Sequence, residues 1–350
     1  MAGMPVVAGG DLEAFAAAIF RAAGMIEQHA AHVASVLVWS NLRGNDGHGV
    51  QRIPRYMELI DEGSLNPRPA MSVRMETAAA LLVDADKGPG PLSMTFAADR
   101  AVKKAKDAGI GLVLVRRTTH TAAIGYYTRR VAAAGMAALA STASIPNMPY
   151  HGTRVPAVST SPLSLAVPGG GDAPIVLDMA TSVLSLGRLA QLRRTGNSLM
   201  PGWALDAEGN DTVDAAKAEL ALPLGGAKGA GMALLSECIA SIMTGNPILA
   251  PALAEGGAAA LHRQNSFILA IDIARFGDLG AFRDGVARLV EVLKSLPRQA
   301  GFDEILMPGE RGDRVYAERL QRGVPIPPVT WAELERVAAR FAVAMPAAML

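Results

Sequence analysis

The sequence contains a single cysteine, Cys238, in 350 residues, which excludes an intrachain disulfide. Because Cys238 stands in an apolar segment, we expect it to be a buried structural thiol. Neither sign of charge dominates, since 33 Lys and Arg residues stand against 32 Asp and Glu residues. A nucleic-acid-binding protein usually carries a basic surplus, so we expect no nucleic-acid partner. The short basic pairs 103–104 (KK) and 116–117 (RR) are interpreted as solvated surface.

Long apolar runs and targeting signals are also missing. No stretch reaches the roughly 18 apolar residues that a membrane span needs, and residues 1–5 do not begin a signal peptide. We therefore expect a cytoplasmic protein without a membrane partner. Half of the residues are hydrophobic and 19% are charged, which is typical of a folded chain. At roughly 150 residues per domain, this length suggests two domains.

The common sequence fingerprints of nucleotide, metal and hydrolase sites are absent. The chain has no G-x-G-x-x-G after a predicted strand, no G-x-x-x-x-G-K-[ST], no H-E-x-x-H, no C-x-x-C and no G-x-S-x-G. His29 and His32 lie three residues apart on a predicted helix, but no further metal ligand stands nearby. We therefore predict no metal site.

Apolar spacing divides the chain into a helical beginning and an α/β middle. Intervals of three and four predict helices that begin after an Asp11 N-cap, over 27–41 and over 54–62. Short apolar runs then alternate with helical patterns, which indicates an α/β layer. The predicted strands are 80–83, 110–115, 136–141, 163–167, 174–177 and 267–271, and the accompanying helices are 92–108, 124–134, 183–193, 229–243 and 281–295.

The chain ends in a further predicted helix from Thr330, with Glu333 at the capping-box position. We assign a mainly helical part, for substrate binding and dimerisation, to 1–75 together with 286–350. The α/β part is assigned to 76–285.

The most informative polar segment is 41–56, where His48 stands between two glycines in a turn that leads into a helix. Glycine neighbours allow another molecule to approach closely. A helix N-terminus favours neutral imidazole, which can accept a proton from a hydroxyl group. Arg52 and Tyr56 follow at intervals of four, and arginine is suited to binding a carboxylate through two parallel hydrogen bonds. The alternative is a turn with a solvated histidine and a surface arginine.

Two further segments have both a functional and a structural interpretation. Residues 118–123 (TTHTAA) follow the predicted strand 110–115, and a loop in this position is where open α/β sheets bind ligands. Turn and capping roles explain these residues equally well. The segment 225–231 (GGAKGAG) opens a helix, where backbone N–H groups and Lys228 can hold an anion. A flexible turn with close helix packing is the alternative.

Seven segments together resemble the malate/L-lactate dehydrogenase family, whose fold is not the ordinary Rossmann fold. They occur in the family's order and cover nearly the whole chain. The segments are LRGNDGHGVQRIPRYMELIDEGSLNPRP (42–69), THTAAIGYY (119–127), STSPLSLAVPGG (159–170), VLDMATS (176–182), PGWALDAEGN (201–210), PLGGAKGAGMALL (223–235) and MPGE (307–310).

The resemblance implies an α/β fold with an unusual nicotinamide-binding domain that contains a mixed sheet. A helical domain formed by the N- and C-terminal segments would accompany it. The implied activity is that of an NAD- or NADP-dependent oxidoreductase that transfers a hydride between nicotinamide and a 2-hydroxy acid/2-oxo acid pair. The implied partners are a small carboxylate substrate and a second copy of the chain, in a homodimer with shared active sites.

The family's motifs also assign roles to individual residues. His48 matches the catalytic histidine, and His120 matches a second histidine that lies at the cofactor and has an acid–base role in some members. Arg52 matches the arginine that binds the substrate carboxylate, Thr160 matches a substrate contact, and we expect Tyr56 beside them. The implied cofactor-binding residues are His120, Thr121, Ala122, Ser144, Asp178, Met179, Ala180, Lys228, Pro308, Gly309 and Glu310.

Four motifs depart from the family pattern. Gly47 replaces a serine that orients the catalytic histidine, and 186–188 (LGR) replaces the relay carboxylate of the imine-reductase branch. The loop 119–122 reads THTA instead of Asn-His-Phe-Gly, and 228–231 reads KGAG instead of Lys-Gly-Tyr-Gly. The loss of two relay groups argues against an ordinary imine reductase. The alternatives are a reductase of imino acids, a non-catalytic nicotinamide-binding sensor and an enzyme with another cofactor.

Overall fold

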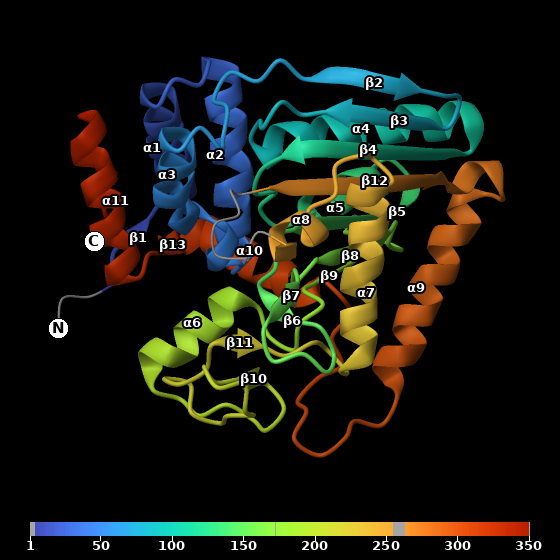
Figure 1. Ribbon diagram of the computed structural model, residues 1–350. Coiled ribbons are helices and arrows are strands. Elements are labelled where there is room, and N and C mark those ends of the chain that lie inside the picture. The colour runs from blue at the N-terminus through green and yellow to red at the C-terminus, as the bar shows by residue number, and fades with distance from the viewer. Residues whose placement is uncertain (1–3, 172, 255–262, 350) are drawn as a thin grey trace.

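The computed structural model describes residues 4–171, 173–254 and 263–349. Its centre is a seven-stranded mixed sheet in the order β2–β3–β4–β12–β5–β8–β9 (Figure 1). β3 and β4 are parallel, and all other neighbouring strands are antiparallel. The strands are β2 (Ser72–Glu76), β3 (Ala80–Asp84), β4 (Ile110–Thr118), β5 (Met136–Ser144), β8 (Leu163–Val167), β9 (Ile175–Met179) and β12 (Gln264–Asp272). The mixed α/β fold was predicted correctly.

The register of these strands brings distant segments of the chain to one end of the sheet. Thr118 at the end of β4 pairs with Gln264, and Gln264 also pairs with Ser144 at the end of β5. On the next two strands, Leu163 at the beginning of β8 pairs with Met179 at the end of β9. We call this end of the sheet the loop end, because the loops that contain His120, Thr160 and Ala180 leave the sheet there.

Helices cover both faces of the sheet, which explains why its central strands are almost continuously apolar. α4 (Gly90–Ala108) and α5 (Gly125–Ala133) pack on one face. Ala97 and Ala101 of α4 are fully buried, so that the helix lies close to the strands. α7 (Ala227–Glu237) continues into a π-helical turn, η3 (Cys238–Ile242), and this pair covers the other face.

The two ends of the chain share a helical core beside the sheet. α1 (Gly9–Ala22), α2 (Glu27–Leu42), α3 (Ile53–Asp61) and α11 (Pro328–Phe341) contribute to one apolar cluster that includes Leu12, Leu37, Ile53 and Leu334. β1 (Val6–Val7) pairs with β13 (Val324–Pro325), and α10 (Glu310–Arg322) packs on α2. The domain boundaries at residues 75 and 286 stay a prediction.

The remaining elements lie mostly below the sheet in Figure 1. α6 (Leu186–Thr195) and the pair β10 (Ala204–Leu205) and β11 (Leu220–Ala221) enclose a small apolar cluster around Leu189 and Leu199. The other elements are η1 (Asp46–His48), η2 (Val50–Arg52), β6 (Met148–Pro149), β7 (Pro156–Val158), α8 (Leu249–Ala254), η4 (Ile273–Arg275) and α9 (Leu279–Ser295). No helix in the described part of the chain is both long and apolar enough to cross a membrane.

Several local predictions were wrong. α1 begins at Gly9, so Asp11 lies in the first turn and does not cap it. α11 begins at Pro328, so Thr330 lies inside the helix and no capping box forms there. Cys238 is half-buried and not fully buried. The 103–104 pair is not all solvated surface, because Lys104 is buried and bonds to Glu76 at 2.9 Å.

Candidate active site

A double turn between α2 and α3 presents His48. Asn41 at the end of α2 donates from Nδ2 to Asp46 at 2.8 Å, and Arg319 of α10 forms an ion pair with the same carboxylate at 2.7 Å. A Cβ atom at Gly49 would lie 2.0 Å from Asn41 Oδ1, so the turn requires glycine there. Local hydrogen bonds and an ion pair from the other end of the chain therefore fix the position of His48.

Three ring side chains from separate segments meet at this turn. His48 Nδ1 lies 3.3 Å from His120 Nε2, and the two imidazole rings are nearly parallel, with 5° between their planes. Tyr56 of α3 is fully buried, and its hydroxyl group lies 3.1 Å from His120 Nδ1 and 2.9 Å from the carbonyl oxygen of His120. The structure thus connects His48, His120 and Tyr56 in one hydrogen-bonded chain.

Arg52 adds a cation beside His48. Its Nε atom donates to the carbonyl oxygen of Gly47 at 2.6 Å. No residue in the described part of the chain accepts a hydrogen bond from its two terminal nitrogens or forms an ion pair with them. Burial lowers the pKa of Arg52, although an arginine stays protonated at neutral pH. The guanidinium group of Arg52 is therefore fixed through Nε, and its two terminal nitrogens are available to an anion.

The surroundings also fix the charge states of this group. Burial, and secondly the charge of Arg52, lower the pKa of His48 to about 4, so that its imidazole is neutral at pH 7. Burial raises the pKa of Tyr56, so that the phenol keeps its proton and stays a hydrogen-bond donor. At neutral pH, Arg52 therefore carries the positive charge and His48 can accept a proton.

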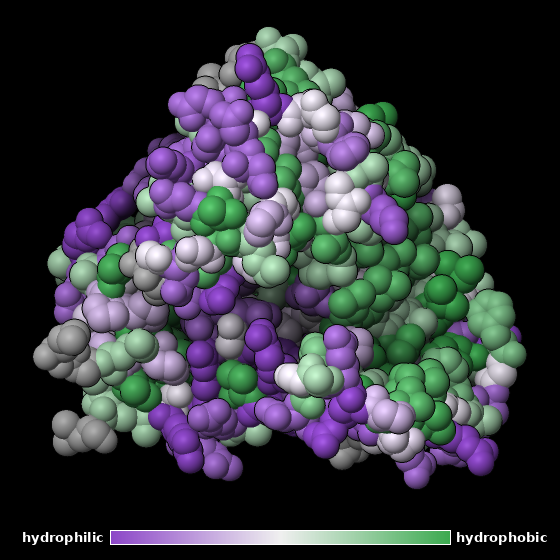
Figure 2. All heavy atoms as spheres, turned by 90° about the horizontal axis from the view of Figure 1, so that it is seen from below, coloured by the Kyte–Doolittle hydropathy of each residue, from purple (hydrophilic) through white to green (hydrophobic). Residues whose placement is uncertain are grey.

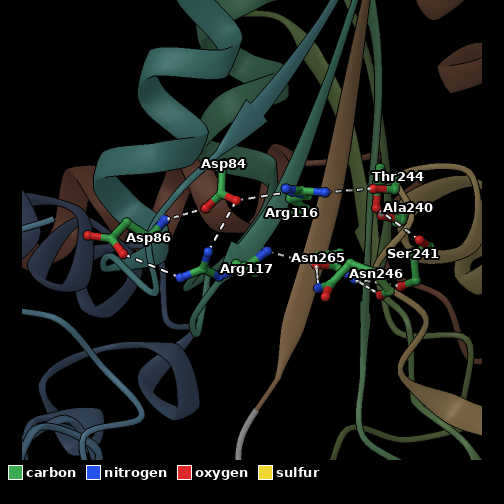
Figure 3. A network of polar contacts seen from close by, with 9 residues as sticks. All are labelled: Asp84, Asp86, Arg116, Arg117, Ala240, Ser241, Thr244, Asn246 and Asn265. Carbon is green, nitrogen blue, oxygen red and sulfur yellow. Dashed lines mark hydrogen bonds and ion pairs between the residues drawn. The ribbon is translucent and has the colours of Figure 1, made fainter. Parts of the chain in front are cut away.

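A polar network at the loop end of the sheet holds the loop that contains His120 (Figure 3). Arg116 and Arg117 at the end of β4 both bind the buried carboxylate of Asp84, at 3.1 and 3.3 Å. Arg117 has a left-handed backbone (φ +53°), and its N–H donates to Asn265 Oδ1 at 2.9 Å. The side-chain amide of Asn265 donates in turn to Ser241 Oγ and to the carbonyl oxygen of Asn246, four residues beyond η3. The interpretation of 116–117 as solvated surface was wrong for Arg116, which is half-buried, and correct for Arg117, which is exposed while it pairs with Asp84.

A second group of predicted residues meets at the loop end of the sheet. The carbonyl oxygen of Thr160 accepts hydrogen bonds from both the backbone N–H and the hydroxyl group of Thr181, two residues beyond β9. Ser144 lies at the same end, where its N–H donates to Ser159 beside Thr160. The carbonyl oxygen of Thr181 accepts from the N–H of Leu224, which leads into α7 and the exposed Lys228. Thr160, Ser144 and Lys228 are thus gathered from three segments.

Asp178 connects the two groups. Its Oδ2 atom accepts a hydrogen bond from the N–H of Gly125, at the start of the helix that follows His120, at 2.8 Å. Burial raises the pKa of Asp178 to about 6, against the opposing effects of the Gly125 hydrogen bond and the charge of Arg43. Asp178 also lines a cavity of about 200 Å³.

The cavity lies between β9, α2, α5 and the beginning of α10. Its lining residues are Trp39, Arg43, Asn45, Gly125, Arg129, Val176, Leu177, Asp178, Met307, Pro308, Gly309, Arg311 and Gly312. Three of the predicted cofactor-binding residues, Asp178, Pro308 and Gly309, are therefore at one cavity. The sequence did not point to Arg43, Arg129 or Arg311, because nothing in the spacing of residues 43, 129 and 311 relates them.

Other predicted residues are placed less directly. Thr121 and Ala122 are almost fully buried behind His120, and Thr121 is bonded to Gln264. The Glu310 side chain points to Lys294, Arg314 and the N–H of Met307. Met179 and Ala180 are half-buried at the end of β9. All of the roles given to these residues stay predictions.

Comparisons with known proteins identify the family of the chain. The sequence profile described as malate/L-lactate dehydrogenase matches residues 7–335. Malate dehydrogenase from Pyrococcus horikoshii is 35% identical over 332 residues, which cover 91% of each chain. Ureidoglycolate dehydrogenase (NAD(+)) from Escherichia coli is 28% identical over 87% of each chain. The crystal structure of malate dehydrogenase from Entamoeba histolytica superposes with a TM-score of 0.91 at 26% identity and covers 98% of this chain and 100% of its own.

Proposed function

The chain belongs to the malate/L-lactate dehydrogenase family, and we propose that it is an NAD(P)-dependent dehydrogenase of a small 2-hydroxy acid. The observation that carries the proposal is the pairing of Arg52, whose terminal nitrogens are available to an anion, with the neutral His48 beside it. Relatives named for malate and ureidoglycolate act on hydroxy acids with a carboxylate, which fits this pair.

Arg52 binds the substrate carboxylate in this proposal. Its Nε atom is used by Gly47, so that Nη1 and Nη2 remain for the ligand. Charge-assisted hydrogen bonds from both nitrogens fix the direction of the acid, and C2 with its hydroxyl group is then held near His48. The bound carboxylate also offsets the charge of Arg52, which is one of the two causes that lower the pKa of His48. Substrate binding therefore makes His48 a stronger base.

Counting donors assigns the protons of the histidine chain. If the single Tyr56 proton is donated to the carbonyl oxygen of His120, His120 Nδ1 must carry the proton that bonds to the Tyr56 oxygen. His120 Nε2 is then unprotonated and accepts from His48 Nδ1–H. This leaves His48 Nε2 unprotonated. During oxidation, His48 Nε2 accepts the proton of the substrate hydroxyl group, and during reduction it returns that proton.

The residues around the cavity suit a nicotinamide dinucleotide, since arginines and a helix N-terminus surround the space beside Asp178. The cofactor would be held there and along the loop end of the sheet by Ser144, residues 178–180, Lys228 and residues 308–310. When bound, its nicotinamide ring supplies the acceptor of the C2 hydride in oxidation and the donor in reduction. We further assign this cofactor-binding role to the sheet and its loops, and substrate positioning to the helical part that presents His48 and Arg52.

We also propose that two copies of the chain associate. α9 has no buried residue, and Leu289 and Val292 of α9 and Leu296 directly after it are all at least half exposed. Leu235 and Ile242 of the α7–η3 segment are also exposed. Figure 2 shows apolar side chains gathered on the right of the molecule, the side on which α7 and α9 lie in Figure 1. A patch of this kind is typical of a protein interface, and a second copy would cover it.

The test is to mix the purified protein with NADH or NADPH and to follow nicotinamide absorbance with a panel of 2-oxo acids and cyclic imino acids. The panel includes pyruvate, oxaloacetate and branched and aromatic oxo acids. We expect NADH or NADPH to be oxidised when an oxo acid is present. In His48→Ala this rate should fall by roughly 100-fold or more, while cofactor binding is kept. Oxidation with imino acids alone would identify an imine reductase. Cofactor binding without turnover across the panel would identify a sensor.

A further inference from the structure

α10 packs on the end of α2, next to the turn that presents His48 (Figure 1). Tyr316 reaches the helical core, but no residue of α10 is fully buried, and the structure describes the whole helix. Ion pairs therefore supply much of its attachment. Near the start of the helix, Asp313 pairs at 2.6 Å with Arg43, the residue directly after α2. The helix is thus tied to the segment that leads into the turn.

Arg319 makes a second attachment, which reaches the turn itself. Its Nη1 and Nη2 atoms lie 2.7 and 3.2 Å from the two carboxylate oxygens of Asp46, so the pair is bidentate. Nη1 also donates to the carbonyl oxygen of Asn41. The side chains of Arg319 and Asp46 are only 17% and 32% exposed, so water screens this pair less than an ordinary surface pair. A bidentate contact of this kind fixes direction as well as distance.

The position of Asp46 determines the position of His48. η1 is the three-residue turn from Asp46 to His48, so the two residues move together. Among the described residues, Asn41 is the one side chain besides Arg319 that donates to the Asp46 carboxylate. In the same part of the chain, only His120 is hydrogen-bonded to the His48 ring. Removal of Arg319 therefore leaves the turn with a single side-chain donor.

We propose that Arg319 is a positioning residue for the reaction, which acts through Asp46 to hold His48 against His120. The inference rests on the function proposed above, because His48 is the base in that function. A displacement of roughly 1 Å at a catalytic group can lower the rate by about 100-fold, so a contact outside the site can have a large effect. A polar helix near the C-terminal end of the chain thereby completes the site.

The first test is the rate of Arg319→Met, which keeps a flexible chain and removes both hydrogen bonds to Asp46. We expect kcat to fall by at least roughly 10-fold and KM to change by less than about threefold. Arg322→Met is the matched control, because Arg322 lies three residues further along α10, is 80% exposed and pairs with Glu318 at 3.5 Å. Its kcat should stay within about twofold of the wild type. Arg319→Lys, which keeps the charge, should recover part of the loss.

Two readouts distinguish positioning from a general loss of stability. Without Arg319, the uncompensated charge of Asp46 lies two residues before His48 and raises its pKa, whereas Arg52 and His120 beside it are unchanged. The acidic limb of the kcat/KM profile should therefore move to higher pH in Arg319→Met. In an Asp46→Ala background, Arg319→Met should cause no further loss of kcat, since Arg319 acts through Asp46. An equal further loss in both backgrounds would overturn the proposal.

Hydrogen exchange tests the attachment without turnover. Amide exchange of residues 45–50 in the full-length protein should be at least roughly 10-fold faster in Arg319→Met than in the wild type, and unchanged in Arg322→Met. A wild type without turnover on the substrate panel would contradict the proposed function, and the exchange rates would still show whether Arg319 holds the turn. Wild-type kcat and wild-type exchange in folded Arg319→Met would overturn the inference. If Arg319→Met does not fold, Arg319→Lys is compared in its place, and wild-type values there would also overturn it.

Discussion

Arg52→Met separates the two effects that the structure gives to this arginine. The first is binding of the substrate carboxylate by Nη1 and Nη2, and the second is the lowering of the pKa of His48 by a nearby positive charge. Methionine keeps a flexible apolar chain of similar reach and removes the charge. Arg55→Met is the matched control, because Arg55 lies three residues further along, is exposed and pairs with Glu58 and Glu62.

The expected loss follows from the number of hydrogen bonds. A hydrogen bond to a charged group contributes about 1.5–3 kcal/mol, so two parallel bonds to the carboxylate contribute roughly 3–6 kcal/mol. This corresponds to a decrease of roughly 10²–10⁴-fold in kcat/KM. Most of the change should be in KM, since the carboxylate is bound equally in the ground state and the transition state. Arg55→Met should stay within about threefold of the wild type.

Two measurements identify the cause. Steady-state rates with the active hydroxy acid and with its methyl ester should show that the wild type prefers the acid and that Arg52→Met does not. The acidic limb of the kcat/KM profile should also move to higher pH in Arg52→Met, since the lowered pKa of His48 rises when the cation is removed. The reasoning is refuted if Arg52→Met loses the acid and the ester to the same extent and leaves the acidic limb in place.

Four further predictions concern charge, positioning and assembly. The folded state holds the pKa of His48 at about 4, below its ordinary value of 6.5, so stability present above pH 6.5 should be lost as pH falls towards 4. His48 is half-buried, so this loss should be below the roughly 3 kcal/mol that full shielding would give, and urea unfolding of His48→Gln should show a smaller loss of stability over the same pH range. Ionisation of Asp178 changes stability in the opposite direction. Its pKa is raised to about 6, so its ionisation at higher pH destabilises the folded state. Asp178→Asn, which can still accept from Gly125, should therefore raise Tm at pH 7.5 and leave it unchanged at pH 4, and the increase should be small because Asp178 stands at an exposed position of β9. Asn265→Ala breaks the network of Figure 3, so it should lower Tm and change kcat more than KM. Arg336→Ala, at an exposed position, is the control and should keep wild-type values. Leu235→Asp should give monomers by light scattering if the exposed apolar patch is the dimer interface, and unchanged dimers would place the interface elsewhere.

Elements with a strong apolar period were predictable because local burial decides them. β8 was predicted at its observed bounds, and α2 to within one residue. β4 was predicted to end at residue 115, but it continues to Thr118 because Gln264 pairs with that residue across the sheet. β2 has no buried residue, so only its pairing with β3 makes it a strand. α10 is strongly polar and is fixed by ion pairs to distant segments, which its own sequence does not reveal.

The candidate site divides in the same way. The spacing of four between His48, Arg52 and Tyr56 was visible in the sequence, and the structure keeps all three around one turn. Tyr56, however, is fully buried and bonds to His120, so its contact with substrate stays a prediction. Arg129 could not be found from the sequence, because its partner Asp313 lies at the other end of the chain.

Gly47 shows how the chain can differ from its relatives and still orient the proposed base. A Cβ atom at Gly47 would lie 3.8 Å from the Cα of Gly187, an ordinary van der Waals distance, so space does not exclude the serine that the resemblance leads us to expect there. In this chain the contact to His48 comes from His120, whose Nε2 atom lies 3.3 Å from His48 Nδ1. His120 is itself held by Tyr56 and by the anchored turn at Arg117. The orienting group therefore comes from the sheet, and the proposed base depends on the correct packing of the sheet against the helical core.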